Sequence, residues 1–148
     1  MNDHRHPEET TAELAELLTR ASWRLRRNER KALAPYGVTF APARALRVLV
    51  NRGPMRIGDL AELLEIAPRT ATTRVDGLET AGLVARSPDP GDRRSTIVAA
   101  TAQGCELVAL LKAERLASAE TLFARLAPGE KAELVRLLGL LVTESREG

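Results

Sequence analysis

The sequence predicts a mainly α-helical protein that contains one short β-hairpin. Aromatic residues make up only 3% of the chain while hydrophobic residues make up 44%, so the core must be built from Leu, Ala and Val, which favours helices over a sheet sandwich. Helical spacing of apolar residues recurs along most of the chain, and one β-branched stretch interrupts it. At 148 residues, the chain has the length of one ordinary domain.

A long first helix is predicted over residues 11–33, where leucines recur at helical spacing and arginines occupy the opposite face. Pro35 and Gly37 end it. The polar residues 1–10 before it are expected to form a disordered leader.

Three shorter helices follow. The first begins at about Ala41 and ends at the break formed by residues 51–54. The next two cover residues 57–64 and 68–81 and are separated by a tight turn, with Gly82 as the stop signal. Two short helices joined in this way are typical of a helix-turn-helix.

A hairpin is predicted directly after this pair of helices. Residues 83–85 form its first strand, residues 88–92 its turn and residues 95–100 its second strand. A hairpin in this position is a wing. Two further helices begin at Thr101 and Pro128.

The predicted organisation is therefore a winged helix-turn-helix over residues 37–101, flanked by a helical dimerisation region formed by residues 11–36 and 102–146. The small middle unit cannot cover such long terminal helices, so the simplest partner is a second copy of the chain. The candidate interface residues are leucines, with the core of a single chain as the alternative location: Leu14, Leu17, Leu18, Leu134, Leu137, Leu138 and Leu141.

The basic residues are almost all arginine, because Lys31, Lys112 and Lys131 are the only lysines among 22 basic residues. The planar guanidinium suits phosphates and base edges better than an ammonium group does. The alternative cause is a GC-rich genome, whose codons favour arginine. The formal net charge is +2.

The sequence offers no enzyme chemistry, cofactor or metal site. The only histidines, His4 and His6, lie in the leader, where a solvated tail is favoured over loose metal binding. The single cysteine, Cys105, is expected to be a small buried residue and not a redox switch. The chain shows neither the apolar core of a signal peptide nor a stretch that could span a bilayer, so a cytoplasmic protein is expected.

Two stretches resemble the MarR family of winged helix-turn-helix transcriptional regulators, and the likeness covers residues 11–146. One joins the wing aspartate and arginines to an apolar strand and a Thr-x-x-Gly helix start: Asp92, Arg93, Arg94, Ile97, Val98, Thr101 and Gly104. The other covers residues 75–84, the end of the recognition helix. The resemblance implies that Arg94 inserts into the DNA minor groove and that Asp92 braces it by a salt bridge.

The second helix of a helix-turn-helix presents its N-terminal side chains to base edges in the major groove. Those residues are Arg69, Thr70, Thr72, Thr73 and Arg74, with a solvated polar face as the alternative reading. Many family members carry Thr-Arg midway along this helix. Here the arginine comes one residue later, a rotation of about 100° around the helix axis.

The wing adds Arg93 and Arg94 at the hairpin tip, and Arg86 on its first strand is a candidate phosphate contact. Family members often sense a small aromatic or anionic effector. The candidate pocket residues combine aromatic and cationic side chains, with ordinary core packing as the alternative for the aromatics: Trp23, Tyr36, Phe40, Arg44 and Arg47.

The sequence thus predicts a sequence-specific transcriptional regulator of double-stranded DNA, a ligand-responsive repressor that binds a pseudo-palindromic operator as a homodimer. The alternative is a helical protein-interaction adaptor that does not bind DNA.

Overall fold

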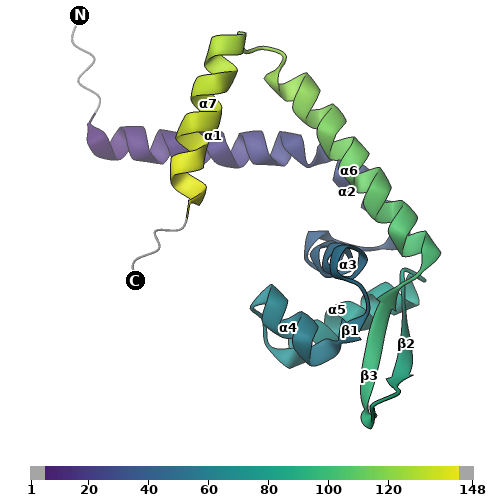
Figure 1. Ribbon diagram of the computed structural model, residues 1–148. Coiled ribbons are helices and arrows are strands. Elements are labelled where there is room, and N and C mark those ends of the chain that lie inside the picture. The colour runs from purple at the N-terminus through teal and green to yellow at the C-terminus, as the bar shows by residue number, and fades with distance from the viewer. Residues whose placement is uncertain (1–5, 144–148) are drawn as a thin grey trace, which may run out of the picture. The chain divides into compact units, whose positions relative to one another are not determined.

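The computed structural model describes residues 6–143, and it is mostly helical with one small sheet (Figure 1). In chain order the elements are α1 (Pro7–Leu25), α2 (Arg27–Leu33), the 3-10 helix η1 (Ala34–Tyr36), α3 (Phe40–Arg52), β1 (Met55–Arg56), α4 (Ile57–Leu64), α5 (Pro68–Thr80), β2 (Val84–Asp89), β3 (Asp92–Ala100), α6 (Ala102–Phe123) and α7 (Pro128–Val142). The predicted winged helix-turn-helix fold is confirmed.

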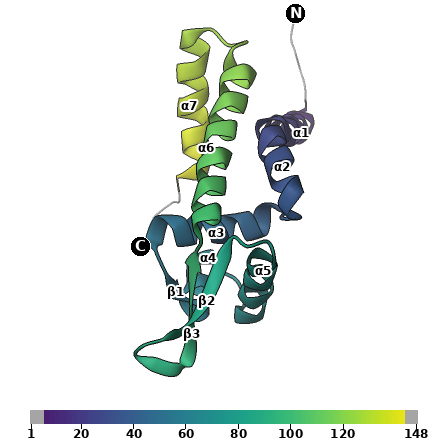
Figure 2. The same cartoon turned by 90° about the vertical axis from the view of Figure 1, so that its right-hand side faces the viewer.

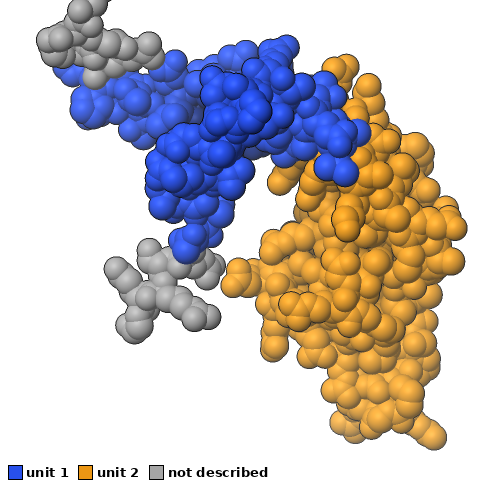
Figure 3. All heavy atoms as spheres, turned by 45° about the horizontal axis from the view of Figure 1, so that its top comes forward, with its two compact units in different colours: residues 1–25, 116–148 blue, residues 26–115 orange. Residues whose placement is uncertain are grey.

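The chain divides into two compact units, shown in different colours in Figure 3. We call residues 26–115 the winged unit, and residues 1–25 with 116–148 the terminal unit. The winged unit contains the predicted DNA-binding region 37–101, together with α2 and the first part of α6.

The wing is a three-stranded antiparallel sheet in the order β1-β3-β2. Its β2–β3 hairpin reaches past α4 and α5 in both ribbon views (Figures 1 and 2). Pro88 and Asp89, predicted as part of the turn, close β2 instead, with a register shift between them. The edge strand β1 was not predicted, because two residues are too few to show an alternating pattern.

A leucine-rich core holds the winged unit together. Each of its main elements contributes a leucine that is at most 2% exposed: Leu46 from α3, Leu60 and Leu64 from α4, Leu78 from α5 and Leu107 from α6. Val98 adds a fully buried side chain from β3. The helix-turn-helix and the wing therefore share one apolar core.

The turn between α4 and α5 is tight because α4 ends on Glu65 in the left-handed conformation, with φ +54°. The amide of Ile66 closes the turn by donating to the carbonyl of Ala61 at 3.1 Å. Pro68 then starts α5, where its missing amide hydrogen costs nothing.

The N-terminal prediction needs two corrections. Residues 7–10, predicted to be disordered, form the first turn of α1, which Pro7 starts and which Glu8 and Glu9 stabilise at its positive end. Residues 1–5 of the predicted leader lie outside the described part, and His6 is exposed and non-helical. The single helix predicted over 11–33 is two helices, separated at Arg26.

The terminal unit has no apolar core of its own within the described residues. Neither α1 nor α7 has a buried residue. Leu14 is 63% exposed and Leu141 is 72% exposed, and Leu17, Leu18 and Leu137 are also exposed. The remaining two candidate interface residues, Leu134 and Leu138, are partly buried.

Candidate nucleic-acid interface

The helix α5 is amphipathic, and its polar face carries the predicted base-reading residues. Ala71, Val75 and Leu78 are fully buried against the core. Four of the predicted base-reading residues point outward and are exposed: Arg69, Thr70, Thr72 and Thr73. The fifth, Arg74, is partly buried. The helix therefore presents one arginine and three threonines near its N-terminus.

Two of the threonine hydroxyls on α5 bond within their own helix. Thr72 Oγ1 donates to the carbonyl of Pro68, and Thr73 Oγ1 donates to the carbonyl of Arg69, both at 3.1 Å. A phosphate oxygen would have to compete for these protons. The exposed methyl groups suit contact with thymine without any such competition.

At the wing tip, Asp92 braces the main chain. One carboxylate oxygen accepts from the amide of Arg94 at 3.0 Å, and the other accepts from Ser95 Oγ at 3.2 Å. Among residues 6–143 no ion pair joins Asp92 to the Arg94 guanidinium, so the salt bridge implied by the resemblance is not formed. Arg93 and Arg94 are exposed.

Arg86 links the wing to the recognition helix. Its guanidinium donates to Glu79 Oε1 at 2.8 Å and to Asp76 Oδ1. The hydrogen bond to Asp76 is the largest cause that raises the pKa of Arg86, so the guanidinium of Arg86 stays positively charged. Both acids of α5 therefore pair with the same arginine of the wing. The proposed contact of Arg86 with phosphate stays a prediction, since both acids already hold its side chain.

A second ion pair, which sequence reasoning missed, lies at the far end of β2. Arg56 Nε and Nη2 lie 2.7 and 2.6 Å from Asp89 Oδ2, and the amide of Gly91 donates to Asp89 Oδ1 at 2.9 Å. The Gly91 amide, followed by Arg56, lowers the pKa of the Asp89 carboxyl. Thirty-three residues separate Arg56 from Asp89, so no local pattern could reveal the pair.

The Thr-x-x-Gly segment joins the wing to α6. Thr101 Oγ1 donates to the carbonyl of Gly82 at 2.7 Å and accepts from the amide of Gly104 at 3.1 Å, which caps the helix. A Cβ built on Gly104 would lie only 2.2 Å from the carbonyl oxygen of Leu83. Glycine is therefore required at this junction.

The predicted effector-pocket residues fall in both units. Trp23 is 61% exposed in the terminal unit, whereas Tyr36, Phe40, Arg44 and Arg47 belong to the winged unit. Arg47 Nη2 lies 2.6 Å from Oε2 of the fully buried Glu29.

A second residue of the predicted pocket also has a neighbour: the guanidinium of Arg26 stacks over the ring of Phe40, 5.1 Å from its centroid. Arg47 and Phe40 are thus both in contact with other side chains of the winged unit. The effector pocket stays a prediction.

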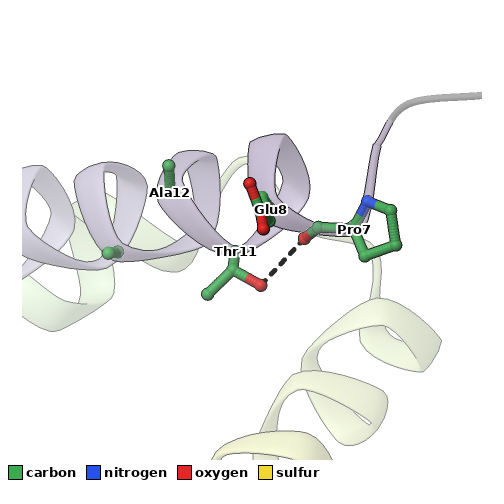
Figure 4. A pocket seen from close by; sticks show the side chains of 5 residues that line it. Pro7, Glu8, Thr11 and Ala12 are labelled. Atoms are coloured by element: carbon green, nitrogen blue, oxygen red, sulfur yellow. Dashed lines mark hydrogen bonds between the residues drawn. The ribbon is translucent and has the colours of Figure 1, made fainter.

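A hollow along the first turns of α1 does not suit an anionic effector. It is lined by Pro7, Glu8, Thr11, Ala12 and Ala15 (Figure 4). The hydroxyl of Thr11 donates to the carbonyl of Pro7 at 2.9 Å, and the only charged group in the lining is the carboxylate of Glu8.

In the described part of the chain, no three His, Cys, Asp or Glu residues are grouped so that they could hold a metal ion. No helix there has the length and apolar character needed to cross a membrane. Cys105 is exposed, so the expectation that it is buried is wrong: at the start of α6 the adjacent Gly104, not Cys105, packs against the core.

Comparison with known proteins gives the same family as the motifs. The model of the MarR family matches residues 39–96. An HTH-type transcriptional regulator of Mycobacterium tuberculosis is 35% identical over 84% of this chain and 85% of its own length. An HTH-type transcriptional repressor of the same species is 32% identical over 86% of this chain and 91% of its own length.

Solved structures agree on the fold. The crystal structure of RV1404 from Mycobacterium tuberculosis superposes with a TM-score of 0.80 at 25% identity, covering 99% of both chains. A mutant MarR from E. coli complexed with operator DNA superposes with a TM-score of 0.68 at 22% identity, covering 93% of this chain and 99% of that one. This chain belongs to the MarR family of winged helix-turn-helix transcriptional regulators.

Proposed function

We propose that this regulator is a homodimeric repressor that binds a pseudo-palindromic operator and releases it in response to a small effector. The observation that carries the proposal is the exposed face of α5, where Arg69 and three threonines stand on a helix whose other face is buried. The repressor named among the relatives and the operator complex of the mutant MarR support it.

In this proposal α5 enters the major groove. Arg69 lies one residue after the helix start, where side chains reach base edges. A guanidinium can bond guanine O6 and N7 together, which is worth about 1–3 kcal/mol of discrimination against a wrong base. The methyl groups of Thr70, Thr72 and Thr73 suit thymine.

The wing tip is assigned to the neighbouring minor groove. Arg94 is exposed, and Asp92 fixes its main chain, so the guanidinium is presented from an ordered turn. Narrow A·T-rich minor grooves concentrate negative potential and attract inserted arginine side chains. Arg93 and Arg86 are assigned to the phosphate backbone of the DNA beside this minor groove.

A second copy of the chain is the proposed cover for the terminal helices. Exposed apolar side chains run along α1 and α7 in the terminal unit, including Leu14 and Leu17 on α1 and Leu140 and Leu141 on α7. Many large exposed apolar side chains in one unit favour an interaction site there. A two-fold dimer would place its recognition helices about 34–36 Å apart, one turn of DNA.

The effector is proposed to be a small aromatic or anionic molecule. Tyr36 and Phe40 are partly buried and Arg44 is exposed within the winged unit, which offers aromatic surface beside a cation. A melting-temperature screen of phenolic carboxylates tests this directly, because a ligand that binds only the folded chain raises its melting temperature.

Arg94→Ala is expected to weaken operator binding by at least about tenfold, because the wing loses its only proposed minor-groove insertion. The variant should remain dimeric, since Arg94 lies outside the terminal helices. Fluorescence anisotropy with a labelled duplex measures the affinity and sedimentation measures the mass. Unchanged affinity would remove the wing from the proposal.

Arg69→Ala is expected to relax base preference at particular positions by about 1–3 kcal/mol, because a direct base contact is lost. Selection from random duplexes with the wild type and the variant compares the two preferences. A uniform loss of affinity across all sequences would assign Arg69 to phosphate contact instead.

The same selection tests the proposed function as a whole. A homodimeric repressor should recover an inverted repeat, and its affinity should fall steeply with salt as phosphate-bound counterions are released. A protein-interaction adaptor would bind no duplex at any salt concentration, and that result would overturn the proposal.

A further inference from the structure

The ion pair between Arg56 and Asp89 joins β1 to β2, two strands that lie on opposite sides of β3 and do not pair with each other. Arg56 ends β1 and directly precedes α4, the first helix of the helix-turn-helix. The backbone of β1 pairs only with Val98 and Ile97 on β3. Asp89 ends β2 at the hairpin turn, so the Arg56 side chain connects the helix-turn-helix directly to the wing tip.

Both oxygens of the Asp89 carboxylate have hydrogen-bond partners. One oxygen receives both guanidinium contacts from Arg56 and the other receives the Gly91 amide, and the residue is only 9% exposed. A carboxylate held in this way has a fixed position, and so does the turn that carries it. The two wing arginines, Arg93 and Arg94, follow four and five residues after Asp89, at the start of β3.

We propose that Arg56 is a positioning residue for DNA binding: through Asp89 it fixes the wing tip relative to the helix-turn-helix, so that wing and recognition helix meet the duplex together. The inference rests on the proposed function. Arg56 acts through Asp89 and makes no DNA contact itself.

A positioning role for Arg56 and Asp89 predicts effects on DNA binding that differ from those of simple charge attraction to phosphate. Removing a negative charge from a DNA-binding unit should tighten binding to phosphate. The proposal expects the reverse for Asp89→Asn, because the amide keeps the shape of the side chain but releases Arg56. An arginine that contacts phosphate also contributes about 1 to the salt slope, whereas a positioning residue does not.

The experiment measures the affinity of the full-length chain for the duplex recovered by selection, at several salt concentrations. Asp89→Asn and Arg56→Ala are each expected to weaken binding about threefold or more with an unchanged salt slope. The double variant should bind no more weakly than either single one, because the pair acts as a unit. Glu62→Gln, an exposed carboxylate on α4, provides the same charge change as a control and should bind as the wild type or more tightly.

Circular dichroism and melting temperature confirm that each variant is folded; if one is not, the other single variant carries the comparison. The inference is overturned if Asp89→Asn binds as tightly as the wild type or more tightly, or if Arg56→Ala lowers the salt slope. A wild type that binds no duplex would overturn the proposed function as well, whereas tight wild-type binding with unchanged variants would overturn this inference alone.

Discussion

Gly104→Ala is expected to lower the free energy of unfolding by about 3 kcal/mol or more. The new Cβ would lie 2.2 Å from the carbonyl oxygen of Leu83 and 3.1 Å from Leu46 Cδ1. The nearer atom belongs to the main chain, so no side-chain rotation can relieve the clash. The start of α6 must move away from Leu83, and this breaks the hydrogen bonds that Thr101 makes at the junction.

Urea denaturation followed by circular dichroism measures this loss, with Gly77→Ala as the matched control. Gly77 also lies within a helix, and a Cβ there meets nothing within 4 Å. The control should therefore gain about 0.5–1 kcal/mol from its better helix propensity. If both variants unfold at the same denaturant concentration, the close approach at Gly104 is not a constraint on this fold.

Glu29→Ala is expected to cost about 2–3 kcal/mol of stability. Glu29 is fully buried, and its carboxylate lies 2.6 Å from Arg47 Nη2 and 2.5 Å from Arg115 Nε. Burial, followed by the nearby positive charge of Arg115, lowers the pKa of Arg47. The carboxylate of Glu29 lies between these two like charges and offsets their repulsion. Without Glu29 they would face each other across a cavity, although partial exposure of both side chains lets water offset some of the cost.

Glu16→Ala provides the comparison for this prediction, because Glu16 pairs with Arg20 at 3.8 Å with both side chains largely exposed. Such a surface pair is worth at most about 0.5 kcal/mol. Thermal and urea unfolding of both variants should therefore separate them clearly. Equal effects would mean that the Glu29 cluster does not tie α2, α3 and α6 together.

Local sequence signals were sufficient for the helix-turn-helix. The bounds of α4 agree with the prediction, and α5 ends one residue earlier than predicted. Amphipathic spacing sets the buried faces of both helices, and Pro68 and Gly82 mark where α5 starts and stops. Each of these signals acts within a few residues.

The features that were missed depend on residues far apart in the chain. Glu29 meets Arg47 and Arg115, which are 18 and 86 residues away. The helix break at Arg26 carries no proline or glycine, but it separates α1, which buries nothing, from α2, which buries Glu29 and Leu33. Tertiary packing thus decides where the first helix ends.

The departure from the family pattern in α5 also has a structural consequence. Thr73, at the position where many family members carry arginine, is exposed, whereas Arg74 is partly buried. The shift by one residue turns the arginine toward the protein. Arg69, near the helix start, is left as the exposed arginine of this face, and sequence alone could not rank the two.

The most direct test of the central claim is the mass of the complex with the selected duplex, measured by sedimentation equilibrium. The account predicts two chains on each duplex that carries both half-sites, with their centres about one helical turn apart. A duplex with one half-site should bind far more weakly. One chain bound per full duplex, with equal affinity for the single half-site, would contradict the account.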